Sequence, residues 1–224
     1  MLTEKYEFPS AELIEKYVGC EEHHSFRREA AELCTTLVKD TQSLIPIDPK
    51  AKHVFLVYEH NIPNSKNYNG DTTREILKEE LEKEGFSVEL CPTYYDLEAE
   101  NGVSFRNFLT MMDKGSREEF RKKYDYVFLF LNFTGYAQTN EVRVTWSTDH
   151  SVDQPWYLAE VPTAVVSLNY TNHLTDVPQA KTFINAYGNK RENIRAVVEK
   201  ITGKSAFTGS AEDNVFCGRW ETRL

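Results

Sequence analysis

The stretch Asp125-Tyr126-Val127-Phe128-Leu129-Phe130-Leu131-Asn132 is an unbroken apolar run between an aspartate and an asparagine. Aromatic and branched side chains follow one another in it, without the polar alternation of a half-exposed strand. Such a run is typical of a strand that helices cover on both faces, as in a parallel sheet. We expect it to be the central strand, with its C-terminal end opening toward Asn132 and Phe133.

Similar runs lie on both sides of this stretch in the sequence. The two strongest are 53–58 and 163–168, and shorter ones are 86–90 and 182–187. Helical patterns alternate with them, which favours a parallel α/β sheet. The sequence therefore predicts a three-layer α/β sandwich with a mainly parallel sheet of five or six strands. A flavodoxin-like order places the strands that begin near 53, 86 and 125 in the order 2-1-3.

Helices are expected where apolar residues recur every three or four positions between capping residues. One runs from Ser10 to Gly19. A second runs from residue 25 to about 41, on the spacing of Phe26, Ala30, Leu33 and Leu37. A helical region is also expected near 105–112. The other expected helices begin at a polar residue that is followed three positions later by Glu, which is the pattern of a capping box. These pairs are Thr72 with Glu75, Ser116 with Glu119, and Asn189 with Glu192. Gly203 is expected to end the last helix.

The totals restrict the class of protein. The 224 residues suit one domain over 25–224 with an N-terminal helical lead-in over 1–24. A net charge of −9 argues against nucleic acid as a partner. No stretch approaches the ~20 apolar residues of a membrane span, and the residues after Met1 lack the apolar core of a signal peptide. We therefore expect a cytoplasmic protein without a membrane partner.

Common catalytic and cofactor motifs are missing from the sequence. It contains no G-x-G-x-x-G, no P-loop and no G-x-S-x-G. Four scattered cysteines form no C-x-x-C pair, so we expect reduced thiols: Cys20, Cys34, Cys91 and Cys217. We expect no metal site and no cofactor. His23 and His24 are adjacent and suit a solvated pair. Asp149-His150 resembles half of an acid/base pair but has no adjacent nucleophile.

Polar residues gather at the predicted carboxyl ends of the strands, where open α/β sheets bind their ligands. They are Glu59, His60, Asn61, Asn132, Phe133, Thr134 and Asn169. One hypothesis makes Asn132, Phe133 and Asn169 substrate-proximal. The alternative makes the set loop residues that satisfy backbone groups.

Two long segments, 133–153 and 214–224, are rich in aromatic residues and arginine. Connections of this length are usually functional or disordered, and aromatic residues and arginine are enriched at interface centres. Arg143, Trp146 and Trp220 are therefore interface candidates. In the alternative hypothesis the two tryptophans cover the domain's own sheet edge.

Four stretches together resemble the C-terminal domain of glycoside hydrolase family 3, in its β-N-acetylhexosaminidase branch from Gram-positive bacteria. They are similar to that family's "REAA…LLKN…LLPL", "WF..EVPT", "DVP..KTYINAY" and "FCGRWDT" motifs. Here they read REAA at 28–31 with 37–47, WYLAEVPT at 156–163, DVP at 176–178 with KTFINAY at 181–187, and FCGRWET at 216–222.

The resemblance implies an accessory role. The family's (β/α)8 barrel precedes this domain and, in this branch, supplies an aspartate nucleophile and a histidine; neither motif occurs here. No catalytic residue is carried over, and Glu141 is only the nearest substitute for the acid/base of the β-glucosidase branch. The expected partner is the barrel of a parent protein, and a homodimer is possible. The alternatives are a stand-alone binding or interaction module and an independent enzyme that uses Asp149 and His150.

Overall fold

The computed structural model describes residues 8–61, 72–91, 116–135, 142–146 and 155–211. In this part of the chain, six strands form one sheet in the order β1-β6-β5-β4-β2-β3. Their bounds are Thr36–Asp40 (β1), His53–His60 (β2), Ser87–Leu90 (β3), Tyr126–Asn132 (β4), Thr163–Ser167 (β5) and Thr182–Asn185 (β6).

The sheet confirms the predicted flavodoxin-like order. β2 lies between β3 and β4, and all pairs among β2 to β6 are parallel. β4 is the central strand of the prediction, and its register places His60 beside Asn132. Only β1 is antiparallel, at the edge beside β6.

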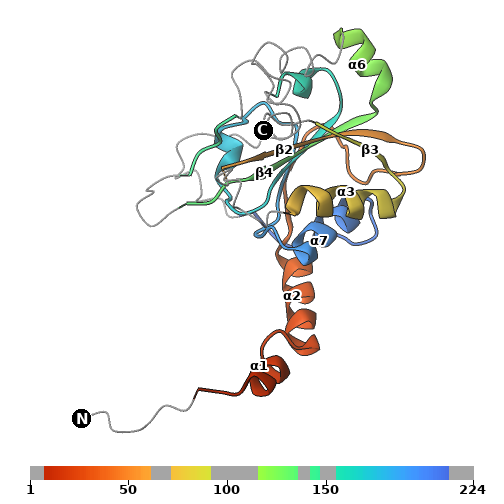
Figure 1. The fold of residues 1–224 in the computed structure, drawn as a ribbon. Helices are drawn as coiled ribbons and strands as arrows, with labels where there is room; N and C mark the ends of the chain where they lie inside the picture. Colours follow the sequence, from red (N-terminus) through yellow and green to blue (C-terminus); the bar gives the residue numbers. More distant parts are fainter. Residues whose placement is uncertain (1–7, 62–71, 92–115, 136–141, 147–154, 212–224) are drawn as a thin grey trace, which may run out of the picture.

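Helices cover both faces, so the fold is the predicted three-layer sandwich (Figure 1). On one face, α3 (Thr73–Glu84) and α7 (Arg191–Ile201) pack Leu77, Leu81 and Val197 on Leu56 and Phe128. The other face is covered by α6 (Arg117–Lys123) and two short 3-10 helices, η1 (Trp156–Ala159) and η2 (His173–Thr175). The strand residues alternate between these two cores, as the pleat of a sheet buried on both faces requires.

The predicted helix over 25–41 is wrong in its second half. α2 covers Glu21–Cys34 and ends at Thr35, and the next residues form β1. The helical spacing continued through Leu37, but residues 35–38 read Thr-Thr-Leu-Val. Branched side chains of this kind prefer the pleated sheet, and pairing with β6 satisfies their backbone groups.

The capping predictions have mixed outcomes. Ser116 and Glu119 form the predicted capping box of α6, and Ser10 caps α1 (Ala11–Tyr17) by accepting a hydrogen bond from the Leu13 backbone N–H. Thr72 is the N-cap of α3 but makes no capping side-chain bond. The prediction for Asn189 is wrong, because α7 has Lys190 as its N-cap. Gly203 follows α7 with φ +75°, and a Cβ there would lie 2.8 Å from Pro46 Cβ.

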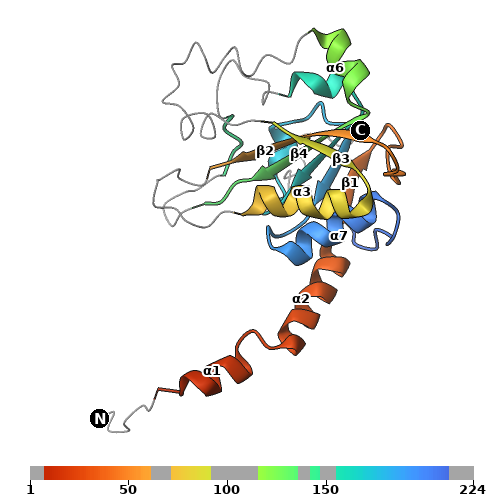
Figure 2. The same ribbon diagram turned by 45° about the vertical axis from the view of Figure 1, so that its right-hand side comes forward.

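The first two helices form an arm that projects from the sandwich (Figure 2). No residue of α1 is buried, and in α2 only Ala31 is. Because α2 runs through residue 24, the division of the chain at 24/25 falls inside a helix; that division stays a prediction. No helix in the described residues is long and apolar enough to cross a membrane.

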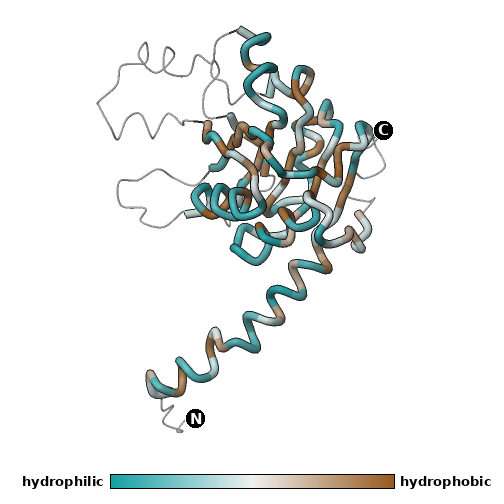
Figure 3. Tube along the Cα trace, turned by 90° about the vertical axis from the view of Figure 1, so that its right-hand side faces the viewer, coloured by the Kyte–Doolittle hydropathy of each residue, from teal (hydrophilic) through white to brown (hydrophobic). Residues whose placement is uncertain are grey.

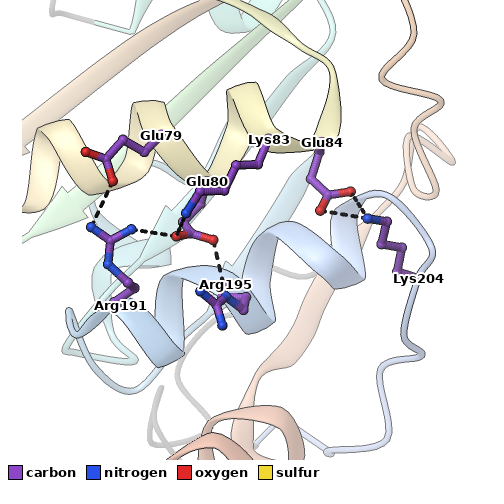
Figure 4. A network of polar contacts seen from close by, with 7 residues as sticks. All are labelled: Glu79, Glu80, Lys83, Glu84, Arg191, Arg195 and Lys204. Atoms are coloured by element: carbon purple, nitrogen blue, oxygen red, sulfur yellow. Dashed lines mark hydrogen bonds and ion pairs between the residues drawn. The ribbon is translucent and has the colours of Figure 1, made fainter.

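A charge network ties α3 to α7 across the helical layer (Figure 4). The Glu80 carboxylate, which is 5% exposed, accepts hydrogen bonds from Lys83, Arg191 and Arg195. Burial alone would raise the pKa of Glu80, but these three cations lower it to about 2. The cluster therefore holds the two helices together through charge-assisted bonds.

Candidate functional site

The carboxyl ends of β2, β4 and β5 meet at one edge of the sheet because these strands are parallel neighbours. This is the edge at which open α/β sheets bind ligands. Its polar side chains fall into two groups, one on each face of the sheet, because successive strand residues point to opposite sides.

The first group is an amide cluster on the α3–α7 face, which we define as Tyr58, Asn132, Asn169 and Asn189. Asn132, which is fully buried, donates through Nδ2 to Tyr58 Oη at 2.6 Å. Its Oδ1 accepts from the Nδ2 atoms of Asn169 and, at 3.4 Å, Asn189. Asn132 thus positions two half-buried amides from the loops after β5 and β6. The structure places Asn132 and Asn169 in hydrogen-bond contact at this edge; that they contact a substrate stays a prediction.

Asn61 has a local role. Its Nδ2 donates to the Thr134 carbonyl at 2.7 Å, and its Oδ1 accepts from the Thr134 backbone N–H at 2.9 Å. Both groups of the amide are used to join the ends of β2 and β4. For this pair, the structure supports the interpretation that strand-end residues satisfy backbone groups.

The second group, on the opposite face, is the buried pair Ser167 and His173. Ser167 Oγ lies 2.8 Å from His173 Nδ1 and donates its own hydrogen to the Tyr170 carbonyl. Nδ1 must therefore carry the imidazole proton, which leaves Nε2 as an acceptor. Nε2 is buried and has no partner within the described residues. Burial lowers the pKa of His173 to about 4; the Asp176 charge opposes this shift, and the Arg143 charge adds to it to a smaller extent. This histidine is neutral at physiological pH and positioned as a hydrogen-bond acceptor.

Arg143 is held against the same region. Its guanidinium pairs with Asp176, the residue that follows η2, and the Val144 backbone N–H donates to the other oxygen of that carboxylate at 3.1 Å. The segment 142–146 belongs to no helix or strand. Asp176 therefore anchors this segment on the domain itself.

The two aromatic candidates within the described residues, Phe133 and Trp146, lie in or on the core. Phe133 is fully buried and its ring meets His173 edge-on at 5.6 Å. Trp146 is half-buried and, with Val144, packs on the core that contains buried Val142. Trp220 lies outside the described residues. Whether these side chains contact a substrate or a partner stays a prediction.

The other candidates add no second site to the described part of the chain. His24 is partly exposed, 3.6 Å from Glu192, and His23 Nδ1 accepts a hydrogen bond from the Gly19 backbone N–H. Among the described residues, Cys20, Cys34 and Cys91 form no disulfide, and no group of three metal-ligating side chains occurs. Asp149, His150, Glu141 and Cys217 lie outside them.

The amide cluster offers neutral donors and acceptors: phenol and carboxamide groups. Such groups suit uncharged, hydroxyl-bearing molecules and can hold them without proton transfer.

Sequence reasoning missed Tyr58, Asn189, Ser167 and His173 as site residues. Tyr58 could have been found from strand parity, because two parallel neighbours in register place Tyr58 and Asn132 on the same face. Asn189 and His173 lie on connections whose course no periodicity reveals.

No family model matches the sequence. A protein of Cellulomonas fimi named "Beta-N-acetylglucosaminidase/beta-glucosidase" is 28% identical over 204 residues, which is 91% of this chain and 34% of that protein. The solved structure of a β-glucoside phosphorylase, BglX, superposes with a TM-score of 0.75 at 28% identity and covers 98% of this chain and 36% of the phosphorylase.

A more distant structure has the same fold. It is a glycoside hydrolase family 3 β-N-acetylglucosaminidase from a Paenibacillus species, with a TM-score of 0.53 and 16% identity over 93% of this chain and 35% of that enzyme. This chain therefore spans about one third of the length of the proteins that it matches.

Proposed function

This chain is a C-terminal-like α/β domain of the glycoside hydrolase family 3 type, and on that premise we propose that it is an accessory domain of a sugar-processing enzyme. In this role it packs on a (β/α)8 barrel that carries the reacting groups and helps to shape the sugar site. The specificity we propose is that of the β-N-acetylhexosaminidase branch.

The observation that carries the proposal is the amide cluster at the carboxyl edge of the sheet. Asn169 and Asn189 are half-buried and are both held by the buried Asn132. A neutral sugar offers hydroxyl and amide groups that pair with carboxamides, and fixed amides bind such groups at a low entropic cost. The cluster contains no carboxylate, so we propose binding and positioning, with the chemistry supplied by the barrel.

The comparisons support the class of enzyme and leave the sugar as part of the proposal. The Cellulomonas fimi protein is named for both N-acetylglucosaminidase and glucosidase activity, and BglX is named a phosphorylase. All three names concern β-linked glucosides or their N-acetyl analogues. The motifs shared with the hexosaminidase branch favour the N-acetylated sugar.

A chimera tests the accessory role. This chain replaces the matched third of the Cellulomonas fimi enzyme, and the control is the same enzyme truncated before that third. We expect the chimera to hydrolyse an aryl N-acetyl-β-glucosaminide at least ~10-fold faster than the truncated enzyme, because a positioned wall of the site restores substrate orientation. Equal rates for the two proteins would contradict the accessory role.

The isolated chain is the second control, and we expect no hydrolysis from it. Turnover that survives repurification and disappears in Asp149→Asn or His150→Ala would favour an independent enzyme instead. The remaining alternative is a stand-alone binding module on the same fold. Calorimetric binding of N-acetylglucosamine to the isolated chain, lost in Asn169→Ala, together with an inactive chimera, would favour that alternative.

A further inference from the structure

Exposed apolar side chains are concentrated on the N-terminal arm. The described residues contain nine exposed large hydrophobic side chains, and seven of them lie between residues 8 and 33: Phe8, Leu13, Ile14, Tyr17, Val18, Phe26 and Leu33. Figure 3 shows apolar positions recurring along the arm away from the sandwich. Soluble proteins rarely leave this many large apolar side chains exposed on one projecting segment without a partner.

Three of these side chains lie on one face of α1 (Ala11–Tyr17). Leu13, Ile14 and Tyr17 are spaced as neighbours on a helical surface, whereas Glu12 and Glu15 point to the other side. The helix has its own N-cap in Ser10 and Gly19 beyond its end with φ +73°. An amphipathic pattern with complete caps is typical of a helix that packs on another surface.

The arm is held at its base. Arg27 pairs with Glu192 at 3.1 Å, and Glu32 pairs with Lys200 at 3.0 Å, so two ion pairs join α2 to α7. The Lys200 side chain is fully buried and also donates to the Ala206 carbonyl at 2.6 Å. These contacts fix the direction of α2 and leave the apolar face of α1 uncovered.

The comparison with BglX places the arm in the context of a longer protein. The superposition covers 98% of this chain, so most of the arm, residues 8–34, belongs to the shared structure. About two thirds of BglX lies outside the matched part. The arm is therefore a feature shared with a much longer protein, which contains additional chain against which an exposed helix can pack.

We propose that the apolar face of α1, formed by Leu13, Ile14 and Tyr17, is the surface on which the barrel domain docks. This inference rests on the proposed accessory function and adds the surface by which the two domains associate. The partner it fits is an apolar groove, because the face consists of Leu13, Ile14 and Tyr17 while Glu12 and Glu15 point away from it. The arm, fixed on α7, then sets the orientation of the carboxyl edge relative to the barrel.

Hydrogen exchange compares the isolated chain with the chimera described above. We expect the amides of residues 11–17 to exchange at least ~10-fold more slowly in the chimera, because docking suppresses the opening of this helix. The test variant is Leu13→Lys with Tyr17→Lys. The matched control is Glu12→Gln with Glu15→Gln, which changes the net charge by the same amount on the opposite face.

The proposal expects the double lysine variant to lose the added protection in the chimera and the double glutamine variant to keep it. Both variants should leave the melting temperature of the isolated chain unchanged, because all four side chains are exposed. Equal exchange of residues 11–17 in the chimera and the isolated chain would overturn the proposal. A measured mass of twice 26.0 kDa for the isolated chain, reduced to the monomer mass in the double lysine variant, would also overturn it. A second copy of the chain would then cover the face. If the chimera hydrolyses the substrate while residues 11–17 stay unprotected, the docking proposal is wrong and the accessory function is supported.

Discussion

Arg191 of α7 donates to the nearly buried carboxylate of Glu80 on α3 at 2.6 Å, and this bond is the centre of the network in Figure 4. Replacing the carboxylate by an amide leaves three cations around a neutral group. We expect Glu80→Gln to lower the free energy of unfolding by about 1–3 kcal/mol in urea titrations. Glu79→Gln is the control, because Glu79 is exposed and binds only the outer side of Arg191; it should cost less than about 0.5 kcal/mol.

The same residue gives an acid dependence. The pKa of Glu80 is about 2 in the folded chain and near its ordinary value of 4.5 in the unfolded chain. Its contribution is therefore complete above pH 4.5 and is lost as the pH falls toward 2. After discounting for the exposed outer sides of the three cations, we expect about 1–2 kcal/mol from this titration. If the free energy of unfolding falls equally steeply with pH over this range in Glu80→Gln and in the unsubstituted chain, the assignment to Glu80 is wrong.

His173 is expected to act in a separate pH window. Burial lowers its folded pKa to about 4, whereas the unfolded value is near 6.5. The unfolded state therefore binds more protons between these values, and stability falls as the pH drops from 6.5 to 4. We expect a loss of about 1–2 kcal/mol between pH 7 and 5 that is absent in His173→Gln. The control is His24→Gln, since His24 is partly exposed on the arm. If the loss of stability with falling pH persists in His173→Gln, a group other than His173 causes it.

The sheet was predictable from the sequence because a strand buried on both faces has an unmistakable composition. The centres of the runs that became β2, β4 and β5 are wholly apolar over 54–57, 127–131 and 164–166, so a core on both sides accommodates them. β1 was missed because Leu37 continues the helical spacing of Phe26 and Leu33. That spacing describes a face that this domain does not bury, since Phe26 is 59% and Leu33 56% exposed. Periodicity identified a real amphipathic surface, but the end of the helix was decided by pairing with β6, a contact with residues nearly 150 positions away.

The candidate site was predictable to a lesser degree. Strand ends are visible in the sequence, so Asn132 and Asn169 could be placed at one edge. The tautomer of His173 and the hydrogen bonds of Asn132 with Asn169 and Asn189 depend on the geometry of the loops after β5 and β6. Local sequence preferences do not determine that geometry.

The bond between Tyr58 and Asn132 can be measured by a double-mutant cycle. Tyr58→Phe removes the hydroxyl that accepts from Asn132 Nδ2, and Asn132→Leu removes the amide with little change in volume. Because each single variant removes one side of this buried hydrogen bond, we expect each to cost about 1–3 kcal/mol. The double variant should cost less than the sum, with a coupling energy of about 1 kcal/mol. Additive losses in urea unfolding would show that the two side chains contribute independently.

Trp146 distinguishes an interface from a domain core. The side chain is half-buried and packs on the core that includes Val142, which favours the interpretation that it covers its own domain. We therefore expect Trp146→Ala to destabilise the isolated chain by about 2 kcal/mol, somewhat less than the truncation of a fully buried aromatic residue. Thr145→Ala, at the exposed neighbouring position, is the control and should change the free energy of unfolding by less than about 0.5 kcal/mol. If Trp146→Ala leaves the stability of the isolated chain unchanged and instead exposes the domain boundary of the chimera to protease, Trp146 belongs to the interface.

Trp220→Ala, made separately and measured in the same two assays, tests the tail in the same way. Unchanged stability of the isolated chain, together with weaker association of the two domains in the chimera, is the result expected of an interface residue.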